Sequence, residues 1–183
     1  DTLSFAPHKF GGICGSGVLL KRSRMPLEPQ MHGGASTTLY RSGTPALGLA
    51  AATAFSLELA CAGREERCAI VRRHSVRLRK VLSAYPAVRI NSPEGAVPHI
   101  LNLSVKNVKG TVFQRALSER GVCVSVKSAC SADGLPSRAV FAVSRDRRNA
   151  LSSWRISLSH LTTDAEIDEF LAIFDECYHE LVK

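Results

Sequence analysis

The chain has 183 residues, 45% of them hydrophobic and 22% charged, with a formal net charge of +8. This length and composition are typical of an ordinary globular protein with one good core, or one domain plus an appendage. They exclude a membrane-spanning chain, because no apolar run approaches the length that crosses a bilayer, and no signal peptide is recognisable. The chain starts at Asp1 without a Met, which suggests a piece of a longer protein.

The positive charge permits contact with nucleic acid or an acidic protein. However, the sequence has no arginine-rich tract with interleaved aromatics, which a nucleic-acid platform would show. The six cysteines are scattered without a C-x-x-C pair. Disulfide frameworks are denser and belong to smaller secreted chains, so we expect reduced thiols, a cytoplasmic location and no metal site.

The first segment, 2–12, is a short extended stretch that ends near Pro7 and runs into a glycine-rich turn. The apolar residues 18–20 are typical of a return strand, so the opening predicts a hairpin with Lys9 near its bend. A lysine at such a turn is usually only solvated. The functional interpretation requires its amine to form an imine with an aldehyde cofactor.

The segment 31–45 is rich in glycine and hydroxyl side chains, and Arg41 is its charged residue. Backbone N–H groups, a hydroxyl and an arginine are the parts of a phosphate site. The simpler interpretation is a surface loop that leads into a helix capped near Thr44 with Pro45 at its first position. That helix, 46–62, is almost all Ala and Leu, so we expect it to be buried on most sides.

The rest of the chain predicts a small α/β or α+β domain with helices on one side of a sheet. A helix over 65–85 has arginines on a solvent face, and Thr163 and Glu166 form a capping box before a final helix. Strands, helices and one polar loop alternate between them. The strands are expected at 88–90, 99–105, 122–126 and 154–159, the helices at 111–120 (with Val112, Phe113 and Leu117 inward) and 137–143, and the polar loop at 144–149.

Cys130 lies where the strand pattern of 122–126 gives way to small, turn-forming residues. Such neighbours neither cover a thiol nor fix its position, and Lys127 favours the reactive thiolate. The alternative is an inert loop cysteine. Arg155 lies in an apolar strand, where its charge needs a partner and its planar guanidinium suits a carboxylate.

Together, an amine, a phosphate site, a carboxylate site and an accessible thiol point to pyridoxal phosphate, an amino acid and sulfur chemistry. At these residues the chain resembles the cysteine desulfurases, which are class V aminotransferase-like PLP enzymes. The matching segments run in family order and are 4–9 with Gly11 and Gly12, 31–34, 41–44, 98–102, 128–131, 155–157 and 162–167. The family's chain is about twice as long, so this one is identified as its C-terminal half.

The resemblance implies a role for each residue. Lys9 would be the Schiff-base lysine and proton carrier, and His8 would contact the cofactor phosphate. Thr44 would reach the phosphate of the partner subunit in a homodimer. Arg155 would bind the carboxylate of L-cysteine, and Cys130 would take its sulfur as a persulfide, releasing alanine. The sulfur would pass to an iron–sulfur scaffold or a tRNA-thiolating enzyme.

The resemblance also implies the PLP-dependent transferase fold. We predict that residues 1–44 are a remnant of the large PLP-binding domain, 45–85 are connecting helices and 86–183 are the small C-terminal domain. The chain departs from the family pattern at Ala6, at 13–14 and at 35–37. Because the N-terminal half would hold the main cofactor contacts, we expect the chain alone to bind PLP weakly or not at all and to be largely inactive.

Two other interpretations stay open. The chain could belong to another class V aminotransferase or lyase in which Cys130 is incidental. It could also be a non-catalytic interaction domain of sulfur trafficking, whose basic helix docks an acidic partner or tRNA.

Overall fold

The computed structural model describes residues 1–34, 38–127 and 135–183. The chain divides into two compact units, Asp1–Glu65 and Glu66–Lys183, which are described separately. The division falls inside the range 45–85 that the sequence analysis assigns to connecting helices. Within the described ranges, no helix is long and apolar enough to cross a membrane.

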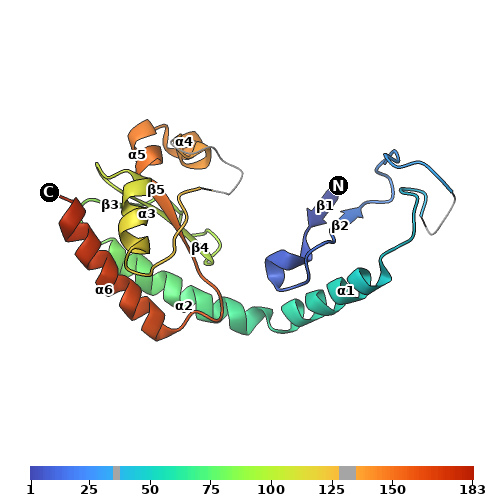
Figure 1. Ribbon diagram of the computed structural model, residues 1–183, viewed down its shortest axis with the longest axis horizontal. Coiled ribbons are helices and arrows are strands. Elements are labelled where there is room, and N and C mark those ends of the chain that lie inside the picture. The colour runs from blue at the N-terminus through green and yellow to red at the C-terminus, as the bar shows by residue number, and fades with distance from the viewer. Residues whose placement is uncertain (35–37, 128–134) are drawn as a thin grey trace. The chain divides into compact units, whose positions relative to one another are not determined.

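The first unit begins with the predicted hairpin (Figure 1). Strand β1 (Thr2–Phe5) pairs antiparallel with β2 (Val18–Lys21), from Thr2 opposite Lys21 to Phe5 opposite Val18. A short 3₁₀ helix, η1 (Pro7–Phe10), forms the first part of the connection. The prediction that Lys9 lies near the bend is therefore confirmed.

Helix α1 (Leu47–Ala62) corrects two predictions. Its N-cap is Ala46, which has no side chain able to accept a hydrogen bond, so the helix begins later than the expected cap at Thr44. No residue of α1 is buried in the part of the chain that the structure describes. The expectation of burial was wrong for this chain by itself, because an apolar helix is buried only where other elements cover it.

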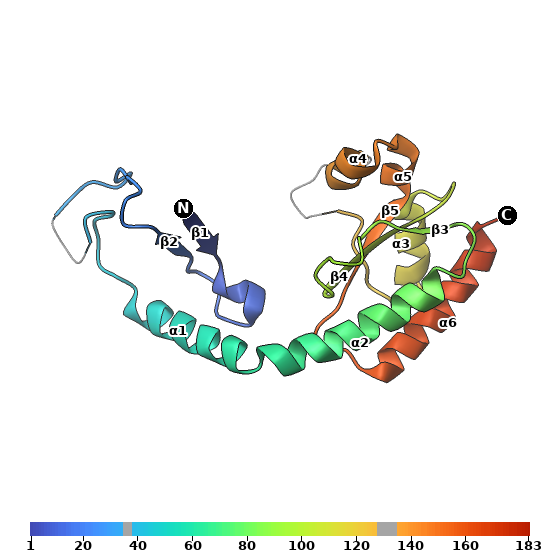
Figure 2. The same ribbon diagram turned by 180° about the vertical axis from the view of Figure 1, so that it is seen from behind.

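The second unit has helices on both faces of a small sheet (Figures 1 and 2). Its elements are α2 (Arg64–Leu82), β3 (Val88–Ile90), β4 (Ile100–Val105), α3 (Gly110–Ser118), α4 (Arg138–Ser144), α5 (Arg147–Ser152), β5 (Ser153–Ser157) and α6 (Asp164–Leu181).

Four predictions for this unit were wrong, the first being that its helices lie on one side of the sheet. The segment 144–149 was expected to be a loop, but α5 begins within it because the Asp146 side chain accepts a hydrogen bond from the Asn149 backbone N–H at 3.0 Å. The strand expected at 122–126 is reduced to one bridge between Ser125 and Arg155. Val112, expected to point inward, is exposed.

The sheet has the order β3-β4-β5, with both pairs antiparallel. Since side chains alternate between the faces of a strand, the register sorts them into two sets. One face is apolar and packs on helices, whereas the other carries polar side chains toward α5. The apolar set is Val88, Ile90, Leu101, Leu103, Val105, Trp154 and Ile156, and the polar set includes Arg89, Asn102, Ser104 and Arg155.

An aromatic cluster forms the centre of the core. Phe113 of α3 stacks on Trp154 of β5 with ring centroids 5.3 Å apart, and Phe174 of α6 contacts both rings. Gly110 begins α3 where a Cβ atom would lie only 2.5 Å from the Ser153 carbonyl oxygen. The helix can approach the sheet this closely only with glycine at that position.

The final helix starts as predicted. The Thr163 hydroxyl accepts a hydrogen bond from the Glu166 N–H at 3.2 Å, and the Glu166 carboxylate accepts one from the Thr163 N–H at 2.7 Å. Arg73 and Arg77 of α2 bind Asp164 and Asp168 of α6. These ion pairs tie the two helices together beneath the apolar face of the sheet.

Candidate functional site

His8 and Lys9 both belong to η1 in the first unit, and both are exposed. Backbone bonds fix this turn: the Lys9 N–H donates to the Ala6 carbonyl at 3.1 Å, and the Gly12 N–H donates to the Pro7 carbonyl at 2.9 Å. A Cβ on Gly12 would lie 2.6 Å from the Pro7 Cβ. The glycine therefore allows the tight turn that presents the imidazole and the amine outward.

The beginning and the end of the glycine- and hydroxyl-rich segment 31–45 contact each other. The Ser42 hydroxyl donates to the His32 carbonyl at 3.0 Å, and the Ser42 N–H donates to the Met31 carbonyl at 3.2 Å. A Cβ on Gly33 would lie 2.8 Å from the Ser42 Cβ. Thr44 is exposed just after this junction, so its hydroxyl is accessible to a ligand.

Arg155 lies in the second unit on the polar face of the sheet. It is opposite Asn102 of β4, and its backbone exchanges hydrogen bonds with Ser125 at 2.7 and 3.1 Å. Its neighbours Trp154 and Ile156 are buried in the core and hold the strand in place. The Arg155 Nε is buried without a hydrogen-bond partner among the described residues. Since buried polar groups normally have a partner, this N–H can donate to a bound anion.

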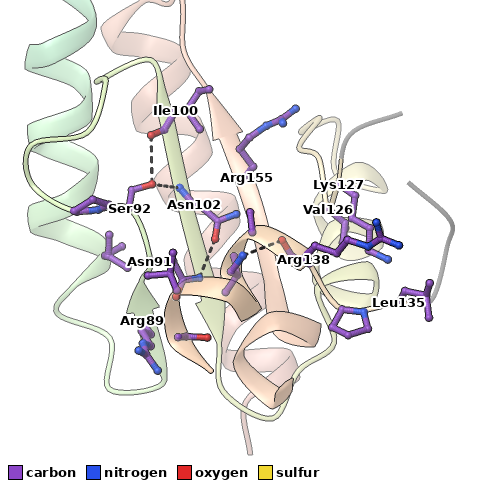
Figure 3. A pocket seen from close by; sticks show the side chains of 18 residues that line it. Arg89, Asn91, Ser92, Ile100, Asn102, Val126, Lys127, Leu135, Arg138 and Arg155 are labelled. Atoms are coloured by element: carbon purple, nitrogen blue, oxygen red, sulfur yellow. Dashed lines mark hydrogen bonds between the residues drawn. The ribbon is translucent and has the colours of Figure 1, made fainter. Parts of the chain in front are cut away.

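Arg155 lines a cavity of about 890 Å³ between the polar face of the sheet and α4 (Figure 3). Arg89, Lys127 and Arg138 line it as well, and none of the carboxylates in residues 1–34, 38–127 and 135–183 does. Ile100 and Val143 add apolar surface. The balance of charge favours an anionic ligand.

The sequence analysis missed a hydrogen-bonded network of four side chains, two of which, Asn91 and Asn102, line this cavity. The Asn91 amide donates to the Asn102 Oδ1 and to the Ser104 hydroxyl, both at 2.8 Å, and accepts from the Asn149 amide at 2.9 Å. The signal in the sequence is that Asn102 and Ser104 alternate with leucines along β4, which indicates a second, polar face.

The structure places the predicted site residues in two groups. His8, Lys9 and Thr44 lie in the first unit and Arg155 in the second. Cys130 belongs to 128–134 and lies outside the described residues, so its predicted role stays a prediction. Within the described ranges, no group of three or more His, Cys, Asp or Glu side chains is arranged to hold a metal ion.

The family model of aminotransferase class-V matches residues 1–170. The chain belongs to the aminotransferase class-V family.

Curated relatives of this class V chain include the cysteine desulfurase IscS of Azotobacter vinelandii, which is 37% identical over 92% of the chain and 42% of the relative. A NifS/IcsS protein homolog of Lactobacillus delbrueckii is 31% identical over the whole chain and 48% of the relative. The class V chain thus spans about half the length of the curated relatives it matches.

Solved structures agree with this family. A NifS-like protein aligns with a TM-score of 0.85 and 30% identity, covering 99% of this chain and 47% of its own. The cysteine desulfurase CsdA of Escherichia coli aligns with a TM-score of 0.71 at 16% identity, a likeness that concerns the fold alone.

Proposed function

We propose that this class V chain is the C-terminal half of a PLP-dependent cysteine desulfurase, in which Cys130 takes sulfur from L-cysteine. The observation that carries the proposal is Arg155, whose buried Nε has no hydrogen-bond partner among the described residues and which lies in a cavity that no described carboxylate lines. An α-carboxylate is the natural partner of such a group. Matched relatives that carry the name cysteine desulfurase add support.

The donors of the first unit fit pyridoxal phosphate by their chemistry. Lys9 offers an exposed amine for the aldehyde, and the exposed imidazole of His8 and hydroxyl of Thr44 offer hydrogen bonds to a phosphate. Ala6, which precedes η1, has no hydroxyl to add to this set. When bound, the cofactor supplies an electron sink beside the substrate carbon.

The residues of this chain would then act on L-cysteine in sequence. Arg155 holds the substrate carboxylate and fixes its orientation. The Lys9 amine moves a proton at the substrate carbon. The Cys130 thiolate attacks the substrate sulfur, so that an S–S bond forms and the bond between the substrate β-carbon and sulfur breaks. The electron pair of the broken bond stays with the β-carbon, which becomes the methyl carbon of alanine after protonation. The sulfur remains on Cys130 as a persulfide.

The partners follow from the same proposal. We infer that an N-terminal half completes the PLP-transferase fold, with 1–44 as a remnant of the large domain and 86–183 as the small one. The exposed apolar side chains of α1, Leu47, Phe55 and Leu59 among them, are surface for that half to cover. A homodimer, a cytoplasmic location and a sulfur-accepting scaffold or tRNA-thiolating enzyme belong to this proposal too.

The decisive experiment measures alanine and persulfide formation from L-cysteine by the complete protein that contains this chain. Cys130→Ala should abolish both, whereas Cys123→Ala, at an exposed cysteine of the second unit, should leave both unchanged. Alkylation and mass spectrometry should locate the persulfide on Cys130. Unchanged turnover of Cys130→Ala would instead favour another class V aminotransferase or lyase.

The isolated 183-residue chain provides a second test. We expect no stable visible absorption band after incubation with PLP, because the proposed main cofactor contacts lie in the other half. A stoichiometric yellow complex that disappears in Lys9→Ala would contradict this expectation.

The interpretation as a non-catalytic interaction domain has less support. It relied on the basic face of the helix now described as α2. Arg73 and Arg77 of that helix bind Asp164 and Asp168, so part of the basic face stabilises the fold rather than presenting charge to a partner.

A further inference from the structure

The cavity around Arg155 is larger and more positive than a single amino-acid carboxylate requires. Its volume of about 890 Å³ lies in the range of roughly 300–1,000 Å³ that accommodates small organic ligands. L-cysteine carries only one carboxylate, yet Arg138 lines the same cavity from a different element, α4. The site therefore has both space and charge beyond the first anion.

Arg138 lacks an ion-pair partner in the part of the chain that the structure describes. Arg89, by contrast, lies 3.9 Å from Asp146, which partly balances its charge. Arg138 is also the first residue of α4, where the helix dipole mildly disfavours a cation. Arg138 is exposed, so its guanidinium is accessible to an anion in the cavity.

Apolar side chains line the same cavity as the two arginines. Ile100 of β4 and Val143 of α4 are among them, and both are largely exposed to it and to solvent. Figure 3 shows Arg155 extending from β5 and Arg138 lying beside Lys127 and Val126 at the other wall. Because both arginines and both apolar side chains line one cavity, a ligand that carries two anionic groups there suits an aliphatic spacer.

We propose that this cavity takes a small organic dianion, with one carboxylate on Arg155, an aliphatic spacer against Ile100 and Val143, and a second anionic group on Arg138. The proposal rests on the proposed function only for the assignment of Arg155 to a carboxylate. Arg138 determines specificity for the second charge, and the L-cysteine carboxylate uses the first subsite alone.

The test titrates the ¹⁵N-labelled 183-residue chain with adipate, suberate and hexanoate and follows backbone amide shifts. Hexanoate offers one carboxylate on the same kind of spacer. A second charge-assisted hydrogen-bonded contact should make at least one dicarboxylate bind on the order of tenfold tighter than hexanoate. Shifts should concentrate on residues that line the cavity.

Three variants separate the two subsites. Arg138→Ala should reduce dicarboxylate affinity to the level of hexanoate and leave hexanoate binding unchanged. Arg155→Ala should weaken every ligand. Arg148→Ala is the matched control, because Arg148 is exposed on the neighbouring α5 and does not line the cavity, and it should change nothing.

The outcomes distinguish the two proposals. If hexanoate binds through Arg155 but neither dicarboxylate binds tighter, or if Arg138→Ala behaves like Arg148→Ala, the dianion site is overturned and the carboxylate role of Arg155 stands. If no carboxylate binds, or if binding ignores Arg155→Ala, both assignments are overturned. A dicarboxylate preference that both arginine variants remove supports the dianion site even if the complete protein proves not to be a desulfurase.

Discussion

Asn91 offers the sharpest test of how the cavity is held together. Its side chain, directly after β3, makes three hydrogen bonds, at 2.8, 2.8 and 2.9 Å, to β4 and to α5. Asn91→Ala removes all three. At about 1 kcal/mol net for each bond, the expected loss is about 2 to 3 kcal/mol of the free energy of unfolding.

The size of the loss in the free energy of unfolding depends on whether the three former partners of Asn91 find other hydrogen bonds. Ser104 is 2% exposed and keeps a bond of 3.0 Å from its hydroxyl to the Asn149 carbonyl. Asn149 is 8% exposed, and its amide loses its partner. Asn102 is only partly buried beside the cavity, so water can replace its lost bond and lower the cost.

Urea unfolding followed by tryptophan fluorescence measures this loss, because Trp154 is the chain's single tryptophan and is buried in the second unit. Ser83→Ala, at an exposed position, should stay within about 0.5 kcal/mol of the wild type. Combining Asn91→Ala with Asn149→Ala should cost less than the sum of the single changes, since both remove the same bond. A loss below about 1 kcal/mol, or strict additivity, would refute the network as described.

Three further changes test individual contacts by the same unfolding assay. Thr163→Ala should cost about 1 kcal/mol by removing the side-chain half of the capping box, with Thr163→Ser as a nearly neutral control. Hydrogen bonds from the Thr163 backbone N–H and, second, from its hydroxyl lower the pKa of Glu166, so this stabilisation is present above the ordinary value of 4.5 and disappears as the pH falls through the folded-state pKa. Since Thr163→Ala keeps the backbone bond, the acid loss should shrink but persist, and its complete disappearance would argue against the backbone bond as the main cause. Burial and the hydrogen bond to Asp175 raise the pKa of Tyr85 to about 12, so the wild type should lose stability as the pH rises from 10 toward 12. Tyr85→Phe should cost about 1 kcal/mol at neutral pH and should not show this alkaline loss. Parallel alkaline curves of stability against pH for the two proteins would contradict this cause. His74 is 1% exposed with both ring nitrogens unbonded among the described residues and Asp164 at 3.6 Å, so His74→Leu should stabilise the fold by about 1 kcal/mol, and a loss of that size would mean that the imidazole has a favourable polar contact.

Local signals in the sequence predicted the elements whose causes are local. The capping box of Thr163 and Glu166 and the apolar face that follows were sufficient to predict α6, and the proline and glycines around Lys9 were sufficient to predict the hairpin. Each depends on residues within a few positions of one another, so no distant partner has to be known.

Predictions failed where the cause lies in another part of the chain. The β-branched run 122–126 has strand propensity, but it forms only the bridge between Ser125 and Arg155, because a strand requires a partner along its length. Helix α1 is apolar yet exposed, because burial depends on what covers a helix. Helix α5, which was not predicted, does have a local signal, because Asp146 is its N-cap. The arginines around Asp146 made the segment resemble a polar loop.

The sequence by itself determined the family resemblance and the chemistry of the candidate residues, since an amine, a guanidinium and a thiol keep their reactivity in any fold. The match of residues 1–170 to aminotransferase class-V confirms the family. The tertiary structure alone decided that Arg155 shares a cavity with Arg138 and Arg89, and that Asn91, which bonds to Asn149, lines it together with Asn102. Strand register and the packing of α4 and α5 bring these residues together from distant positions, and no local pattern encodes such a pairing.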